Sequence, residues 1–595
     1  MKINLTQKII ITLSALIVSS ASLSATDYTS QIIGNFTFQN GDTVILEESS
    51  FPYPLIEASG ISAGSGSGAI ISVANPATDG IYISIGTSAN PIVGSDFFAR
   101  GLRPVIAGSY TSINLGTNTT IETFSDSVSM MVYGVIAYAN ADFSAGDNLT
   151  IRSNGTHKNG GYGILSQGST TSIGNNLKIY TAGGTADAAI YSYAAGNVTV
   201  GDNAYIETYG LAITTRSAGS VTVGDYLKTV NANVGVASYE TGSRITVGNN
   251  AHIEAAHMGV LAQVDSFAVI GDNLKVYATN QGINATSNGN ITVGDNAYVE
   301  SAIGVRAQTG ASITMQNSTI KGIGSEGVGL SIGPDATINV ANSTVNGEQN
   351  AIYVQMAAGG PNDGNAVLTV SGGTLTSQTG AVIASSGTND TQSEIIKTTV
   401  VIKDGTEASS LTGIFYEGNS ETSIGSELEV NVMGVDTIVD GRFLDGTNLD
   451  ATFSISDGAT WNSVGASNMD NLVLEDANIN MVLTSASDRI VTDNLTVEGS
   501  NIVNVGLTND FLEEIIAMGL PQDFDVSIVA SFTDGTGSVA YDIATSNDEG
   551  STWSIDDLGN GVYRIYDITL VPEPSTYAMI FGALALGFAA YRRRK

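Results

Sequence analysis

The chain contains no cysteine and only three histidines among its 595 residues. The absence of cysteine excludes a disulfide framework and all thiolate chemistry. Histidine is a common general base near neutral pH and the commonest metal ligand, so its scarcity leaves few candidates for either role. A chain without disulfides must draw its stability from a large packed core.

Basic residues are also few, with 22 Lys and Arg against 57 Asp and Glu. The two terminal segments hold six of the basic residues and one acidic residue, so the rest of the chain has a net charge of −40. Nucleic acid phosphates would be repelled by such a surface, and we expect no nucleic-acid partner. An acidic surface is consistent with a soluble, self-repelling body.

The dominant feature of the sequence is an eight-residue motif that occurs six times between Ile173 and Glu300. Each copy begins with Ile or Val, continues with Gly and then Asp or Asn, and ends in alternating apolar and polar residues. The motif glycines are Gly174, Gly201, Gly224, Gly248, Gly271 and Gly294, so the spacings are 27, 23, 24, 23 and 23 residues. A fixed period of this length indicates a stack of repeated units.

The alternation after each glycine is that of a strand with one buried face. Two columns are apolar except for one Thr, and we predict that they point inward: Leu177, Ala204, Leu227, Ala251, Leu274 and Ala297, then Ile179, Ile206, Thr229, Ile253, Val276 and Val299. Two columns should point outward: Lys178, Tyr205, Lys228, His252, Lys275 and Tyr298, then Tyr180, Glu207, Val230, Glu254, Tyr277 and Glu300. We interpret His252 as an ordinary member of its column.

Two further short strands follow in each unit, for example Gly235–Ser238 and Ile245–Val247. Three strands and three turns in about 23 residues leave no room for a helix, and a propeller blade needs about 40 residues or more. We therefore predict an all-β fold, a right-handed parallel β-helix. Leu alternates with Ala inside and Lys with Tyr or His outside, which separates like charges on adjacent strands.

The Gly-Asp-Asn segment suits a tight corner, because Asn and Asp tolerate positive φ and bond nearby amides. We predict an Asn ladder at Asn176, Asn203, Asn250, Asn273 and Asn296. An alternative use of this corner is Ca²⁺ binding, since that ion favours several oxygen ligands. The candidate ligands are Asp202, Asp225, Asp272 and Asp295, although Asn175 and Asn249 interrupt their column.

The repeat extends with less regularity in both directions, and we divide the chain accordingly. We predict an N-terminal cap with irregular first coils over 26–110 and the β-helix over 111–500, most regular over 146–315. Residues 501–570 should form a C-terminal β cap that includes a short helix, Phe511 to Met518, capped by Asn509. About 17 to 20 coils at ~4.8 Å each would make a rod of roughly 80 to 100 Å.

The first 25 residues have the features of a signal peptide. Lys2 and Lys8 precede the apolar run Ile9 to Val18, and small residues follow with a predicted cut near Ser24 or Ala25. An apolar run of this length is too short for an ordinary membrane span. We therefore expect export by the Sec machinery.

The last 25 residues, 571–595, form the most specific signal in the chain. Pro572, Glu573 and Pro574 precede an apolar run over 577–591, and Arg592, Arg593, Arg594 and Lys595 close the chain. Fifteen helical residues span about 22 Å, so the run could form a short transmembrane helix with its basic end in the cytoplasm. A plain tail anchor is the alternative reading.

This order of elements closely resembles the PEP-CTERM sorting tail of exported proteins of Gram-negative bacteria. The resemblance implies recognition by an exosortase through Pro572, Glu573 and Pro574 and the terminal arginines. It also implies a membrane-anchored intermediate, removal of the tail, and transfer of the body to the cell envelope surface or the extracellular matrix. Proteins of this kind are associated with exopolysaccharide and biofilm.

The body resembles autotransporter passengers and pectin-lyase-like β-helices, for example in the segment Leu368–Ser377. Enzymes of that fold need a local group of carboxylates, whereas the acidic residues here are dispersed along the sequence. We predict no catalytic residue, no cofactor and no enzymatic activity. The expected function is a structural or adhesive surface protein that contacts extracellular polysaccharide. The alternative is a β-helix polysaccharide lyase or glycoside hydrolase.

Overall fold

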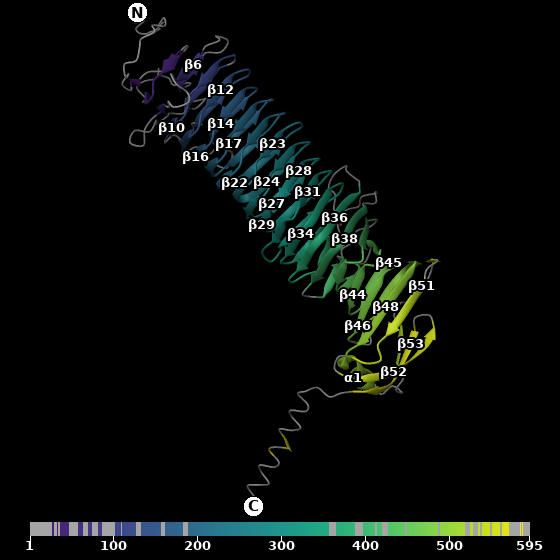
Figure 1. Cartoon of the computed structure of the whole chain (residues 1–595). Coiled ribbons are helices and arrows are strands. Elements are labelled where there is room, and N and C mark those ends of the chain that lie inside the picture. The colour runs from purple at the N-terminus through teal and green to yellow at the C-terminus, as the bar shows by residue number, and fades with distance from the viewer. Residues whose placement is uncertain are drawn as a thin grey trace, which may run out of the picture.

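The structure, a computed structural model, is an elongated stack of β-strand coils (Figure 1). It describes residues 26–28, 32–33, 36–46, 58–63, 70–73, 81–85, 102–108, 110–125, 132–155, 161–182, 188–355, 365–386, 397–410, 413–418, 426–446, 449–485, 488–517, 524–527, 534–535, 538–547, 550–559, 562–570, 583, 584 and 586. Fifty strands form one sheet, and every strand pairing given for it is parallel. Each coil contributes a strand to three ladders, which we call the first, second and third faces.

The first face follows the Gly-Asp-Asn corner and consists of β1 (Asp27–Tyr28), β4 (Thr43–Leu46), β7 (Tyr82–Ile85), β10 (Thr120–Ser125), β13 (Thr150–Gly155), β16 (Lys178–Ala182), β19 (Tyr205–Thr208), β22 (Lys228–Tyr239), β24 (His252–Gln263), β26 (Lys275–Ala278), β29 (Tyr298–Ser301), β32 (Thr319–Gly322), β34 (Thr337–Gly347), β36 (Ala366–Ser377), β38 (Lys397–Ser410), β41 (Ile438–Asp440), β44 (Thr460–Val464), β46 (Asn478–Leu483), β48 (Ser500–Leu507) and β51 (Ser538–Ile543).

The second face also uses β22 and β24, and adds β2 (Ile32–Ile33), β5 (Ala58–Ala63), β8 (Leu102–Ala107), β11 (Tyr133–Ala137), β14 (Tyr162–Gln167), β17 (Ala188–Tyr193), β20 (Leu211–Thr215), β27 (Gln281–Thr286), β30 (Ile303–Gln308), β33 (Val328–Ile332), β35 (Asn350–Gln355), β37 (Ile383–Ser386), β39 (Ile414–Glu417), β42 (Arg442–Leu444), β45 (Ser467–Glu475) and β47 (Ile490–Glu498).

The third face also uses β34, β36, β38, β45 and β47, and adds β3 (Phe36–Phe38), β6 (Ile70–Val73), β9 (Ser112–Asn114), β12 (Asp142–Ala145), β15 (Thr170–Ile173), β18 (Asn197–Val200), β21 (Ser220–Val223), β23 (Arg244–Val247), β25 (Phe267–Ile270), β28 (Asn290–Asp295), β31 (Ser312–Gln316), β40 (Ser426–Met433), β43 (Leu449–Ser456) and β50 (Asp534–Gly535).

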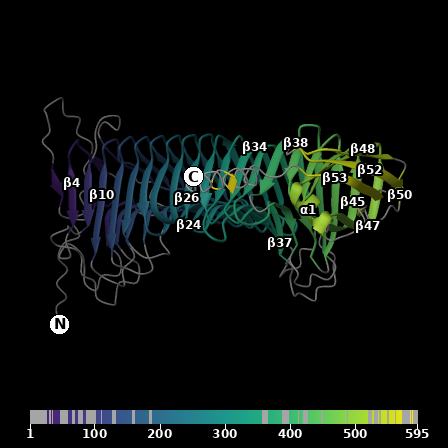
Figure 2. The ribbon, with the colours of Figure 1, turned by 90° about the horizontal axis from the view of Figure 1, so that it is seen from below.

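The described part of the first face contains twenty strands in one unbroken ladder. At ~4.8 Å per strand the ladder is about 90 Å long. The regular stacking of the coils is clearest from below (Figure 2). The predicted β-helix, coil number and rod length are therefore confirmed, whereas its right-handed sense stays a prediction.

The interior of the rod is the predicted apolar core. Every member of the two inward columns is at most 2% exposed, including Thr229 at 0%. The Leu and Ala of neighbouring coils alternate along the column, so large and small side chains interdigitate at close packing. The strand pairing is in register at these positions, for example Ile206 with Thr229 and Ile253 with Val276.

The N-terminal region belongs to the solenoid. We predicted a cap with irregular first coils over 26–110, and the described strands of this region, β1 to β8, are coils that stack directly on those that follow. Strands β3 and β4 lie on either side of the turn at Gln39 to Asp42, as predicted. They are not hydrogen-bonded to each other, because β3 pairs with β6 and β4 pairs with β7.

The C-terminal boundary lies beyond the predicted residue 500, because β48, β50 and β51 continue the parallel ladders to Ile543. The predicted helix is confirmed as α1 (Asn509–Ala517), which buries Phe511, Leu512 and Ile515 against the last coils. The predicted antiparallel strands are also confirmed. They are β49 (Phe524–Ser527), β52 (Thr552–Gly559) and β53 (Val562–Thr569), which form a separate sheet.

No helix within the described residues is both long and apolar enough to span a membrane. The predicted signal peptide, residues 1–25, lies outside the described residues. The sorting tail, residues 571–595, also lies outside them apart from 583, 584 and 586. The predicted membrane helix over 577–591 therefore stays a prediction.

Candidate functional site

The outward columns of the first face form a continuous ladder across six coils. Lys178 pairs in register with Tyr205, and the series continues through Lys228, His252 and Lys275 to Tyr298. All of these side chains are at least partly exposed, so the predicted outward direction and the alternation of Lys with an aromatic ring are confirmed. The structure extends the ladder at its ends to Arg152 and Lys321.

Aromatic rings touch each other along this ladder. Ring centroids are 5.7 Å apart for Tyr180 and Tyr205, and 5.7 Å apart for Tyr277 and Tyr298. Cations cover the two ends, with the Arg152 guanidinium 4.7 Å from the Tyr180 ring centroid and the Lys321 ammonium 5.1 Å from that of Tyr298. Rings and cations at these separations attract each other. The ladder is therefore an ordered strip of rings with charges between them.

Carboxylates hold the aromatic side chains of the ladder. The Tyr205 hydroxyl donates to Glu207 at 3.0 Å, and the Tyr298 hydroxyl donates to Glu300. His252 Nε2 lies 2.7 Å from Glu254. Burial and the bond to Glu207 raise the pKa of Tyr205, and the bond to Glu300 with burial raises the pKa of Tyr298. The phenols thus remain protonated donors, and the strip offers hydroxyls, carboxylates and ammonium groups for hydrogen bonding.

The Asp column at the corner is used within the protein. In each coil the Oδ1 of this Asp or Asn accepts the backbone N–H of its counterpart in the next coil, at 2.7–2.8 Å from Asp147 to Asp295. Asp202, Asp225 and Asp272 are acceptors of this kind, and Asp295 accepts from the Gln316 side chain. Within the described residues no group of three or more His, Cys, Asp or Glu side chains is arranged to hold a metal ion.

The neighbouring Asn column is a partial ladder. Its members adopt positive φ, for example 61° at Asn176 and 61° at Asn203, as a tight corner requires. Side-chain bonds join Asn148 to Asn118, Asn176 to Asn148 and Asn273 to Asn250. The column is interrupted because Tyr226 occupies the equivalent position with φ 62°.

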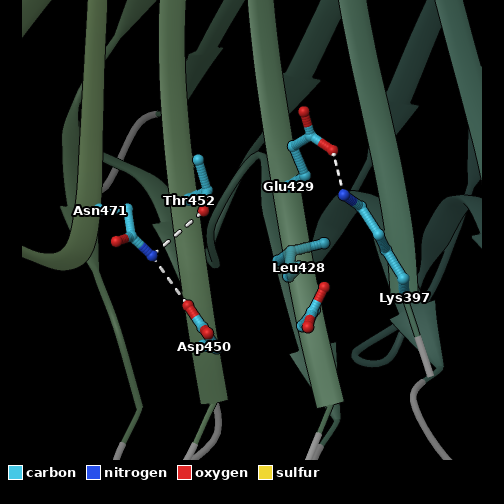
Figure 3. A pocket seen from close by; sticks show the side chains of 7 residues that line it. Lys397, Leu428, Glu429, Asp450, Thr452 and Asn471 are labelled. Carbon is cyan, nitrogen blue, oxygen red and sulfur yellow. Dashed lines mark hydrogen bonds and ion pairs between the residues drawn. The ribbon is translucent and has the colours of Figure 1, made fainter. Parts of the chain in front are cut away.

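A pocket of about 150 Å³ opens on the third face further along the rod (Figure 3). Lys397 Nζ lies 2.9 Å from Glu429 Oε2, and Asn471 Nδ2 donates to Asp450 Oδ1 at 2.8 Å. The other lining residues are Glu427, Leu428 and Thr452. The residues come from β38, β40, β43 and β45, four successive coils. The pocket thus joins one basic side chain to several carboxylates that are far apart in the sequence.

A pair of carboxyl groups lies close to this pocket. Burial, followed by a hydrogen bond to the Asp470 carboxyl and its charge, raises the pKa of Asp445 to about 8. The two residues are held side by side because Asp445 N–H donates to the Asn468 carbonyl at 3.1 Å. At neutral pH the pair therefore shares a proton, the arrangement that like charges at short distance impose.

The sequence analysis described the acidic residues as dispersed, and this was wrong for Asp445 and Asp470. They are 25 residues apart, which is about one coil, and parallel stacking brings such residues together. A search for carboxylates separated by one period would have found them. Of the other predicted sites, Pro572, Glu573, Pro574, Arg592, Arg593 and Arg594 lie outside the described residues.

Comparisons with known proteins leave the family open. No family model matches the sequence, and no curated protein matches it. One similar solved structure is the crystal structure of the autotransporter UpaB from E. coli strain CFT073, with 10% identity over 92% of this chain and 100% of that chain. Its TM-score is 0.15, and at that value the similarity carries no argument about fold or function. The β-helix is established by the strand ladders themselves.

Proposed function

We propose that this protein is an exported, non-enzymatic rod that binds extracellular polysaccharide along its first face. The observation that supports this proposal most directly is the strip of aromatic rings and charges from Arg152 to Lys321. Aromatic rings present apolar faces with polar edges, which suits the apolar faces and hydroxyl rims of sugars. The strip is straight and repeats every ~4.8 Å, so an extended polymer could contact many coils at once.

Export and sorting are the second part of the proposal. Residues 1–25 would direct the chain to Sec export, and 571–595 would present Pro572, Glu573 and Pro574 to an exosortase. The body would then pass from a membrane-anchored intermediate to the cell envelope surface or the extracellular matrix. Mass spectrometry of the exported protein tests this, and we expect the C-terminal peptide ending in Lys595 to be absent. Its recovery from the exported protein would contradict processing.

Affinity electrophoresis in gels that contain acidic or neutral polysaccharides tests the binding proposal. We expect the double variant Tyr180→Ala, Tyr277→Ala to lose retardation by about tenfold or more, since truncation of central aromatic contacts typically costs ~2 kcal/mol or more. Tyr193→Ala is the matched control, because Tyr193 is exposed on the second face. Equal retardation of the wild type and the double variant would contradict the proposal.

The pocket at Lys397 supports a second candidate, a polysaccharide lyase or glycoside hydrolase. A Lys beside carboxylates could move a proton, and Asp445 holds one at neutral pH. Glycoside hydrolases, however, keep their two carboxyls about 5 to 10 Å apart, whereas Asp445 and Asp470 are hydrogen-bonded. Incubation with acidic and neutral glycans separates the two functions. Unsaturated products or new reducing ends that disappear in Lys397→Ala would establish the enzyme.

A further inference from the structure

Arg306 projects from the second face in β30, between Asn284 and Ser331 of the adjacent coils. One guanidinium nitrogen, Nη2, donates to Gln355 Oε1 at 3.1 Å, and Gln308 Nε2 donates to the same oxygen. The Nε atom of Arg306 is buried and has no hydrogen-bond partner. The guanidinium is thus only partly bonded by the protein.

Arg306 forms no ion pair with any described residue, although the chain carries a net charge of −35. In contrast, Arg152 on the first face pairs with Glu122 at 3.2 Å. Burial lowers the pKa of Arg306, and no neighbouring carboxylate opposes that effect. A partly buried cation without a counter-ion is costly, and buried charges in proteins are normally paired. The partner that would pair with this guanidinium is an anion from outside the described protein.

Amide side chains with unused oxygens surround this cation. Gln281, Asn284 and Asn350 are 5%, 7% and 5% exposed, and their carbonyl oxygens have no partner. They lie on the outer side of the second face, in the coils of β27 and β35 on either side of β30. Leaving a buried polar group unsatisfied costs about 1–3 kcal/mol. An amide can accept and donate hydrogen bonds, which suits the hydroxyl groups of a sugar.

We propose that Arg306, with Gln281, Asn284 and Asn350, forms a binding site for the carboxylate-bearing sugar of an acidic polysaccharide. The guanidinium would bind the uronate carboxylate by charge-assisted hydrogen bonds, and the amides would bind neighbouring hydroxyls. Small side-chain movements would bring the amide oxygens to the sugar. The site lies on the second face, so it is independent of the aromatic strip proposed above.

Isothermal titration of the full-length protein with a galacturonate tetramer tests this site. We expect Arg306→Met to weaken binding at least tenfold, Arg306→Lys to weaken it less, and added salt to weaken it in the wild type. Arg244→Met, on the exposed outer side of the third face, is the matched control and should bind as the wild type does. The Tm of Arg306→Met should equal or exceed that of the wild type, because the change removes an unpaired cation.

Several results would overturn the proposal. Unchanged tetramer binding in Arg306→Met would place the uronate elsewhere, and loss of that binding in the Tyr180, Tyr277 variant instead would assign it to the first face. A fall in Tm in Arg306→Met would mean that the guanidinium is held by the protein's own groups. Equal binding of a neutral dextran oligomer, or of a glutamate tetramer, would remove the assignment to an acidic sugar.

Discussion

At the scale of single residues, the corner glycines are required by the closeness of the coils. A Cβ built at Gly201 would lie 2.4 Å from Asn175 Oδ1 and 2.9 Å from the Asn175 nitrogen, and the other motif glycines meet the preceding coil in the same way. The Asn175 side chain sits there because its Oδ1 accepts the amide of Asp202. The motif therefore pairs glycine with Asp or Asn for one reason, the bond between coils.

We expect Gly201→Ala to destabilise the rod by about 1–3 kcal/mol, the usual cost of forcing extra volume into a packed site. Gly506→Ala is the control, because its Cβ would find only the Met481 carbonyl at 3.9 Å. That variant should be neutral or slightly stabilised. Chemical denaturation followed by circular dichroism measures both. Equal midpoints for Gly201→Ala and the wild type would contradict the steric explanation.

Asp445 predicts a pH dependence. Its carboxyl has a pKa of about 8 in the folded protein, well above the value of ~3.9 for an unfolded Asp. Its contribution to folding is therefore complete below about pH 4 and is lost as the pH rises towards 8. We expect the Tm of Asp445→Asn to rise relative to the wild type across that interval. Melting curves at pH 4, 6 and 8 check this, and a constant Tm difference would contradict it.

At the scale of elements, the sequence predicted strands and faces well where the motif is regular. Inward and outward columns, the third strand of each coil and α1 all follow from local alternation and capping. The pocket at Lys397, the Asp445 pair and the Arg306 site could not be recognised from local pattern. Each depends on which residues become neighbours between coils, and variable loops change that register outside 146–315.

Helix α1 offers a test of the C-terminal end of the rod. Leu512 is 0% exposed and packs on the last coils, whereas Ile516 on the same helix is 52% exposed. We expect Leu512→Ala to cost about 2–5 kcal/mol locally, as truncation of a buried Leu does. Ile516→Ala should have little effect. Hydrogen exchange at β48 and β51 measures the local loss, and equal exchange in the two variants would contradict a capping role.

At the scale of the whole molecule, the alternation of Leu and Ala coils makes two coils the structural unit. Deletion of residues 201–247 would join Val200 to Gly248 and place Leu177 beside Ala251, so the packing is kept. Deletion of 201–223 would place Leu177 beside Leu227 and Lys178 beside Lys228, which crowds the core and sets like charges opposite each other.

We therefore expect the two-coil deletion to fold with a Tm near that of the wild type and to be shorter by about 10 Å. The one-coil deletion should melt at a lower temperature. Small-angle scattering gives the length and calorimetry gives the Tm. If the one-coil deletion proved the more stable of the two, the two-coil unit would be wrong.

The bonds at the Gly-Asp-Asn corner also have a direction. The side chain of each coil accepts the amide of the coil that follows it in the sequence, as Asn175 does for Asp202 and Asp202 does for Asp225. A finished coil thus presents an acceptor that its successor can use at once. In a stack whose units contact only their neighbours, ordering can spread from one unit to the next. Here it can advance from the amino end, the order in which an exported chain emerges, and each new coil would help prevent the emerged part from sliding back.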